Sequence, residues 1–157
     1  METTRPLARA GYLMAALLVV LPLFDAITRF IPMQLGDQKW RFQAAGNFSN
    51  ATLVPLIGLL IALAFTFYAD DPRTRRFVGI VCIVFAVAVL ALAGTFATDY
   101  FGVRAEIPPR LQHGVALASL AAFCKEILAI IVLLLLAAGS LRARVALPAV
   151  VPARVRH

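Results

Sequence analysis

Residues 51–69, ATLVPLIGLLIALAFTFYA, are followed by the polar turn DDPRTRR at 70–76 and then by FVGIVCIVFAVAVLALAGTFA at 77–97. Each apolar stretch is about 20 residues long, enough for an α-helix rising about 1.5 Å per residue to cross a hydrocarbon core of about 30 Å. A turn this short makes the two helices antiparallel neighbours. This part of the chain therefore predicts a transmembrane helical hairpin.

Two further apolar stretches flank the hairpin, at residues 11–30 and 108–141. The second would form a helix about 50 Å long, too long for a bilayer alone, so we place its membrane part at 117–140. Of the 157 residues, 62% are hydrophobic and 15% are charged, which is more apolar surface than one soluble core can hide. The sequence predicts an all-α integral membrane protein, a single domain over residues 1–157 built as a bundle of four transmembrane helices.

The first apolar stretch begins like a signal peptide, because METTRPLARA places basic residues ahead of an apolar run. The run continues through Asp25 to Phe30 without a small-x-small cleavage site, which favours a helix that is retained. We therefore count it as the first transmembrane helix.

Basic residues decide the predicted orientation. The formal net charge is +7, and nine basic residues lie in the N-terminus, the 70–76 turn and a tail at 142–157, against five in the two opposite loops. The richer side is cytoplasmic by the positive-inside rule, so we expect both termini in the cytoplasm and the chain in a bacterial cytoplasmic or intracytoplasmic membrane. The basic tail then meets anionic lipid headgroups, which explains the charge better than nucleic acid does.

The first outer loop, residues 33–49, carries an amphipathic pattern. Trp40, Ala44 and Phe48 share one stripe at helical spacing, which predicts a short helix lying in the membrane interface. Trp40, Arg41 and Phe48 would anchor it at the level of the headgroups. An irregular loop held by the single tryptophan is the alternative.

Charged residues inside the apolar stretches need partners or water, because each costs several kcal/mol at membrane depth. Lys125 and Glu126 lie in the fourth stretch, and Asp25 and Arg29 lie one turn apart in the first, at a comparable depth. We expect a buried network that ties the two helices together, in which Asp25 meets Lys125 and Glu126 meets Arg29 or Lys125. A proton or ion relay is the functional alternative.

Small residues at helical spacing mark two expected packing faces, since close approach of membrane helices requires them. They are Gly79, Cys82, Ala86 and Ala93 in the third helix, and Gly114, Ala118, Ala122 and Ala129 in the fourth. Lys125 falls on the second stripe and is therefore expected to point into the bundle, with Glu126 about 100° around the helix.

Cofactor and catalytic motifs are scarce. Haem or chlorin binding needs an axial ligand, and the two histidines cannot form a pair within the bilayer, so His113 is the one candidate for a single pigment, against an interfacial histidine with no ligand role. Cys82 and Cys124 show no metal-binding spacing, and we predict no metal site or disulfide. No phosphate-binding loop, HExxH or nucleophile elbow occurs, so no enzyme activity is predicted.

Several short pieces between residues 20 and 60 carry a resemblance to a known family: Phe24-Asp25, Ile31-Pro32, Trp40, Gly46 and Pro55-Leu56-Ile57-Gly58-Leu59. In these pieces the chain resembles the HpsJ-like membrane proteins of cyanobacteria, which are linked to polysaccharide secretion. The resemblance implies a non-enzymatic accessory role at the membrane and brings no catalytic residues.

Three functions stay open at this point. The first is an accessory or assembly subunit that binds other integral membrane proteins. The second is a small transporter or channel component that uses Asp25, Lys125 and Glu126. The third is a pigment-, quinone- or haem-associated subunit of a photosynthetic or respiratory complex, with His113 or Trp40 near the cofactor. No cofactor is predicted beyond such contacts and lipid.

Overall fold

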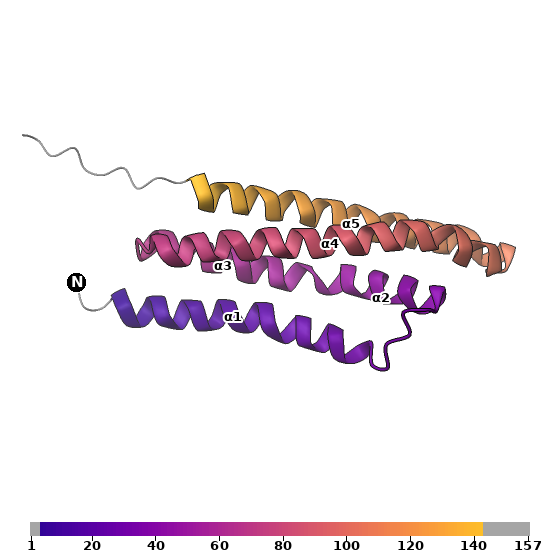
Figure 1. The fold of residues 1–157 in the computed structure, drawn as a ribbon, viewed down its shortest axis with the longest axis horizontal. Helices are drawn as coiled ribbons and strands as arrows, with labels where there is room; N and C mark the ends of the chain where they lie inside the picture. The colour runs from indigo at the N-terminus through magenta and orange to yellow at the C-terminus, as the bar shows by residue number, and fades with distance from the viewer. Residues whose placement is uncertain (1–3, 143–157) are drawn as a thin grey trace, which may run out of the picture.

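The computed structural model describes residues 4–142 and contains five α-helices in that range (Figure 1). In chain order they are α1 (Thr4–Arg29), α2 (Gln38–Ala51), α3 (Leu53–Tyr68), α4 (Pro72–Glu106) and α5 (Pro109–Arg142). Apart from Arg142, the predicted basic tail lies outside the described residues.

Four helical stretches are long and apolar enough to cross a membrane, which confirms the predicted all-helical class and its four apolar spans. They are Pro6–Arg29, Gln38–Tyr68, Pro72–Glu106 and Pro109–Arg142. Their length and composition fit a multi-pass membrane protein.

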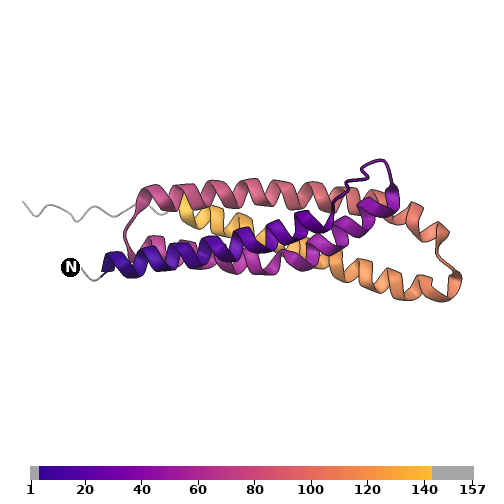
Figure 2. The same ribbon diagram turned by 90° about the horizontal axis from the view of Figure 1, so that it is seen from below.

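The long helices run along one axis and meet at two ends (Figures 1 and 2). The start of α1, the turn at residues 69–71 and the end of α5 lie together, and we call this the turn end. The loop at residues 30–37 and the link between α4 and α5 lie at the opposite end, which we call the loop end.

The segment predicted to lie in the membrane interface, residues 33–49, differs in direction from the expectation. A helix is present, but only Thr52 separates α2 from α3, and Thr52 keeps helical backbone angles of φ −69° and ψ −27°. α2 therefore extends α3 towards the loop end and packs against α4 and α5 (Figure 2). Side-chain contacts to α4, described below, account for this direction.

Helix boundaries also differ from the apolar stretches. α1 begins at Thr4 rather than residue 11, and α4 runs from Pro72 to Glu106 rather than over 77–97. Hydropathy marks only the part of a helix that suits lipid, whereas backbone hydrogen bonding continues the helix through flanking polar residues. α4, with 35 residues, is about 52 Å long.

The turn between α3 and α4 explains why α4 starts so early. Asp71 caps the helix: its carboxylate accepts hydrogen bonds from the backbone N–H groups of Arg73 and Thr74, each at 3.1 Å. It also accepts one from the Thr74 hydroxyl at 2.6 Å, and Pro72 occupies the first helical turn. These hydrogen bonds, that of the Thr74 hydroxyl foremost, lower the pKa of Asp71 below its ordinary value of 3.8.

α4 and α5 form the most extensive antiparallel pair of the bundle. Buried residues of α5 recur at intervals of seven, at Ser119, Glu126, Leu133 and Ser140. The four small residues singled out in the third span, Gly79, Cys82, Ala86 and Ala93, are all buried in α4. Such spacing is that of a coiled-coil seam. A Cβ atom on Gly79 would overlap the Ser140 hydroxyl, so the helices approach closely here.

α1 is held on α3 by a second close approach. A Cβ atom on Gly58 would lie 2.9 Å from the backbone oxygen of Ala15 and 3.0 Å from Cβ of Leu18. Further along, Gly11 faces the ring of Phe65. The two backbones can therefore come together only where side chains are absent.

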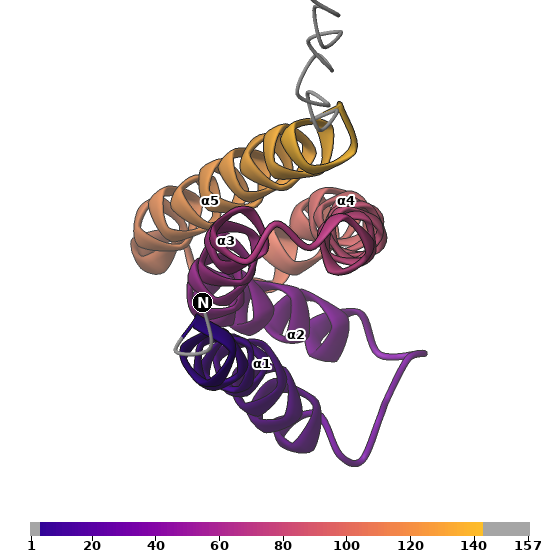
Figure 3. The same ribbon diagram turned by 90° about the vertical axis from the view of Figure 1, so that its left-hand side faces the viewer.

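The helices form an open array rather than a closed square. Seen along the axis, α1 and α5 lie on opposite sides of α3 (Figure 3). Within residues 4–142, no Cα atom of α1 comes within 8 Å of one in α5. The apolar core lies in the turn half, between α3, α4 and α5, and includes Leu59, Leu63, Cys82, Val89 and Leu133.

Replacing Gly58 by alanine tests the α1–α3 contact. We expect Gly58→Ala to lower the free energy of unfolding by about 1–3 kcal/mol, because the new methyl group meets backbone that cannot move aside. Gly94→Ala is the matched control, since nothing lies within 4 Å of that position on α4. Thermal unfolding in detergent gives the comparison, and equal midpoints for the two variants would contradict the close approach.

Replacing Asp71 by alanine tests the cap. We expect Asp71→Ala to cost about 1 kcal/mol at neutral pH. A lowered carboxyl pKa contributes stability above the ordinary value of 3.8, and this contribution is lost as the pH falls through the lowered pKa. Unfolding curves of the wild type and Asp71→Ala should therefore converge in acid. Asp70→Asn, which changes the neighbouring charge but not the cap, should change little across the same range.

Candidate functional site

Polar side chains gather in the loop half of the bundle, where α2, α4 and α5 meet. Two groups stand out among the described residues. One joins Arg41 of α2 to Asp99 of α4, and the other joins the middle of α5 to the end of α2 through Lys125 and Asn50.

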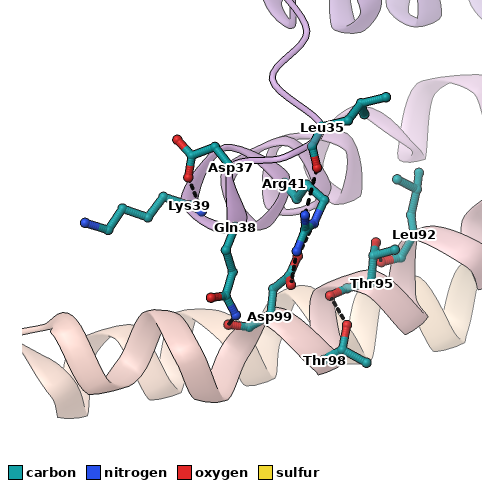
Figure 4. A network of polar contacts seen from close by, with 9 residues as sticks. All are labelled: Leu35, Asp37, Gln38, Lys39, Arg41, Leu92, Thr95, Thr98 and Asp99. Carbon is teal, nitrogen blue, oxygen red and sulfur yellow. Dashed lines mark hydrogen bonds and ion pairs between the residues drawn. The ribbon is translucent and has the colours of Figure 1, made fainter.

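The Arg41–Asp99 pair fixes α2 on α4 (Figure 4). Arg41 donates from Nε to Asp99 Oδ2 at 2.9 Å and from Nη2 to Oδ1 at 2.8 Å, a bidentate geometry. A third donation, to the carbonyl of Leu35 at 2.7 Å, ties the loop to the same guanidinium. Gln38 donates to the Asp99 carbonyl at 3.2 Å. Asp99 is 4% exposed, so the pair is desolvated on one side.

The three expected interfacial anchors therefore point elsewhere. Arg41 binds Asp99, Trp40 packs edge-on against Phe30 with ring centroids 6.0 Å apart, and Phe48 packs edge-on against Phe85. All three are half-buried. They tie α2 to the end of α1 and to α4, because α2 runs along the bundle and turns this stripe towards its neighbours.

Lys125 lies on the outside of α5 and reaches α2. Its Nζ donates to Asn50 Oδ1 at 2.9 Å, and the Lys125 side chain is exposed. Next to it, the buried Ser49 hydroxyl donates to the carbonyl of Ala122 at 3.0 Å. These two bonds join the end of α2 to the middle of α5.

Glu126 points the opposite way, into the α4–α5 seam. It is 2% exposed, and neither carboxyl oxygen has a hydrogen-bond partner among residues 4–142. Gly79 faces Ser140 near one end of the seam, and Tyr100 lies beside Ser119 towards the other. Glu126 lies in the part of the seam between these two points. Ionisation of a buried carboxyl group without a hydrogen-bond partner would cost several kcal/mol.

The predicted charge network between the first and fourth spans is wrong. Asp25 pairs with Arg29 on its own helix, at 2.7 Å, and both side chains are exposed. Neither bonds to Lys125 or Glu126, because the end of α2 at Asn50 lies between Asp25 and Lys125. The i to i+4 spacing on α1 already satisfies both charges without a second helix.

The predicted packing face of α5 is also displaced. Gly114, Ala118 and Lys125 are exposed and Ala122 is half-buried, whereas Ala129 is buried. The face that meets α4 instead carries Ser119, Glu126, Ala129, Leu133, Ala137 and Ser140. Lys125 was expected to point into the bundle but is exposed, and Glu126 is buried in its place. The reason is that the seam repeats every seven residues and includes larger side chains than the small-residue stripe.

Three contributors were missed by sequence reasoning. Asp99 lies beyond the predicted span of 77–97, and Ser49 and Asn50 were assigned no contact within the bundle. A charge at the end of an apolar span and three amides at Gln43, Asn47 and Asn50 were the available signals.

The candidate pigment ligand His113 is exposed on α5, and residues 4–142 contain no cluster of three His, Cys, Asp or Glu side chains suited to a metal ion.

Comparisons with protein families, with characterised proteins and with solved structures find no match to this chain. The resemblance to HpsJ-like proteins therefore stays a prediction.

Replacing Glu126 by leucine tests its place in the seam. We expect Glu126→Leu to raise the free energy of unfolding by about 1–3 kcal/mol, because an unsatisfied buried carboxyl group gives way to an apolar group of similar volume. Arg110→Leu, at an exposed position on the same helix, is the control and should change little. A loss of stability in Glu126→Leu would mean that the carboxyl group has a stabilising partner.

Proposed function

We propose that this chain is a non-enzymatic accessory or assembly subunit of a larger complex in a bacterial cytoplasmic or intracytoplasmic membrane, with both termini cytoplasmic. The observation that carries the proposal is the open array, in which α1 and α5 lie at opposite edges and do not touch. Each edge helix packs on one side and leaves its other side free for a partner helix.

The α1 edge is well suited to lateral binding. Close packing against α3 at Gly58 and Gly11 fixes α1 in place, so its outward face is presented on a firm support. That face carries large apolar residues, among them Leu13, Leu17, Leu21 and Phe24. Packing of such side chains against another membrane helix is a main source of association in lipid.

Transport receives less support from the same geometry. A relay needs titratable or hydrated groups across the whole span, whereas the polar contacts of Lys125, Arg41 and Asp99 stay in the loop half. In the turn half, the described core cluster is apolar, the buried hydroxyls of Thr66 and Ser140 bond to carbonyls of their own helices, and the buried Arg75 lies at the turn end of α4. This arrangement favours binding over conduction.

Site-specific photo-cross-linking tests the accessory role. A photoreactive residue at Leu17 or Leu21 should cross-link in native membranes to one membrane protein that also co-purifies with the chain in mild detergent. The same residue at Val87, exposed on α4, is the matched control and should yield lipid adducts. Absence of a common partner from both α1 positions, or ion flux in liposomes that Lys125→Ala abolishes, would contradict the proposal.

A further inference from the structure

Two hollows meet at Lys125 on the side of the bundle between α2, α3 and α5. The first, of about 670 Å³, lies towards the loop end. On α2 the amides of Gln43, Asn47 and Asn50 line it beside the ring of Phe42, and on α5 the small residues Ala118 and Ala122 line it. Because these α5 residues are small, the hollow stays open where the predicted helix packing does not form.

The second hollow, of about 360 Å³, runs from Lys125 towards the turn end. Apolar side chains of α3 and α5 line it, including Leu56, Ile57, Leu60 and Val132. Asn50 and Lys125 line both hollows and bond to each other at the junction. Together the hollows make one groove, with three amides among apolar residues towards the loop end, a cation at its middle and a mainly apolar part towards the turn end.

The charge of this groove is unbalanced. Among the described residues that line either hollow, Lys125 is the only ionisable one. The nearest acidic residue in sequence, Glu126, points into the α4–α5 seam, and Asp25 is paired with Arg29. The groove is therefore suited to a negatively charged group beside Lys125. Within the described residues, the Lys125 ammonium group bonds to the neutral amide oxygen of Asn50.

Membrane depth agrees with this chemistry. The predicted membrane part of α5, residues 117–140, puts the loop-end boundary of the hydrocarbon near Leu117. Lys125 then lies about 12 Å inside that boundary, and its own long side chain spans part of this depth. A lipid headgroup just above Lys125 and an acyl chain below it would have the direction of an ordinary lipid of that leaflet.

We propose that this groove binds one anionic glycerophospholipid, with its phosphate group at Lys125 Nζ and one acyl chain in the trough between α3 and α5. The amides of Gln43 and Asn47 lie where the rest of the headgroup would sit. The acyl chain would replace contact with bulk lipid by contact with Leu56, Ile57 and Leu60. This site goes beyond the proposed binding of protein partners, which uses the opposite edge at α1.

Native mass spectrometry of the purified full chain tests the site. Delipidated protein is titrated with phosphatidylglycerol or with zwitterionic phosphatidylethanolamine. We expect one tightly bound phosphatidylglycerol and about ten-fold weaker binding of phosphatidylethanolamine. Lys125→Met, which keeps an unbranched side chain only one atom shorter but removes the charge, should weaken phosphatidylglycerol binding about ten-fold, and Lys125→Arg should retain it.

Two more variants separate a built site from surface attraction. Arg110→Gln removes an exposed charge outside the groove and should leave binding unchanged. Ile57→Trp fills the apolar trough without changing charge and should weaken phosphatidylglycerol binding as strongly as Lys125→Met. Circular dichroism and size-exclusion chromatography establish that each variant is folded.

Several outcomes would overturn the proposal. They are equal binding of the two lipids, unchanged binding in folded Lys125→Met or Ile57→Trp, and full competition by inorganic phosphate, which would indicate an anion site without an acyl chain. Recovery of a quinone or pigment from the groove, or its occupation by a partner helix in cross-links from Ala118, would assign a different occupant. Cross-linking from α1 is independent of all these results, so either proposal can fail alone.

Discussion

The antiparallel pairing of α4 and α5 is the contact on which the rest of the bundle depends. For an apolar helix in a bilayer, contact with another helix removes no more apolar surface from water than contact with lipid does. Close packing between helices must therefore supply the stability of the bundle. Gly79, Cys82, Ala86 and Ala93 let the two backbones approach, and Leu133 and Ala137 fill the space opposite. This pair fixes which side of α5 remains for α2 and α3, and so decides where Lys125 lies.

The four apolar spans and their connections could be predicted because lipid requires each crossing segment to satisfy its own backbone. The direction of α2 could not be predicted in the same way. Its amphipathic stripe marks a helix with two unlike faces, but a membrane interface and a neighbouring helix favour the same stripe. The contact that favours the neighbouring helix over the interface joins Arg41 to Asp99, which lie 58 residues apart in the sequence. A local sequence pattern does not predict such a long-range pair.

Lys125 and Glu126 illustrate a second limit. Neighbouring residues on a helix differ by about 100° in direction, so a small error in the assumed packing face exchanges their roles. The small-residue stripe of α5 favoured Lys125 as the buried member. The seam instead follows a seven-residue repeat through Ser119, Glu126, Leu133 and Ser140, and this repeat includes one acidic and one large residue that sequence reasoning did not count as packing residues. Predicting the candidate site therefore required the register of α4 against α5.

The separation of these two charges bears on function more than either charge does alone. An adjacent Lys–Glu pair facing the same way would neutralise itself and offer little to a ligand. Here the seam holds Glu126 at 2% exposure while Lys125 faces a lateral groove with no acidic residue in its lining. Among the described residues, the groove thus holds a positive charge whose bonded partner, Asn50, is neutral, which suits an anionic ligand. Among residues 4–142, the core of the turn half is the apolar cluster around Leu59, Val89 and Leu133, and this cluster favours a group that enters from the side and binds over one that passes through.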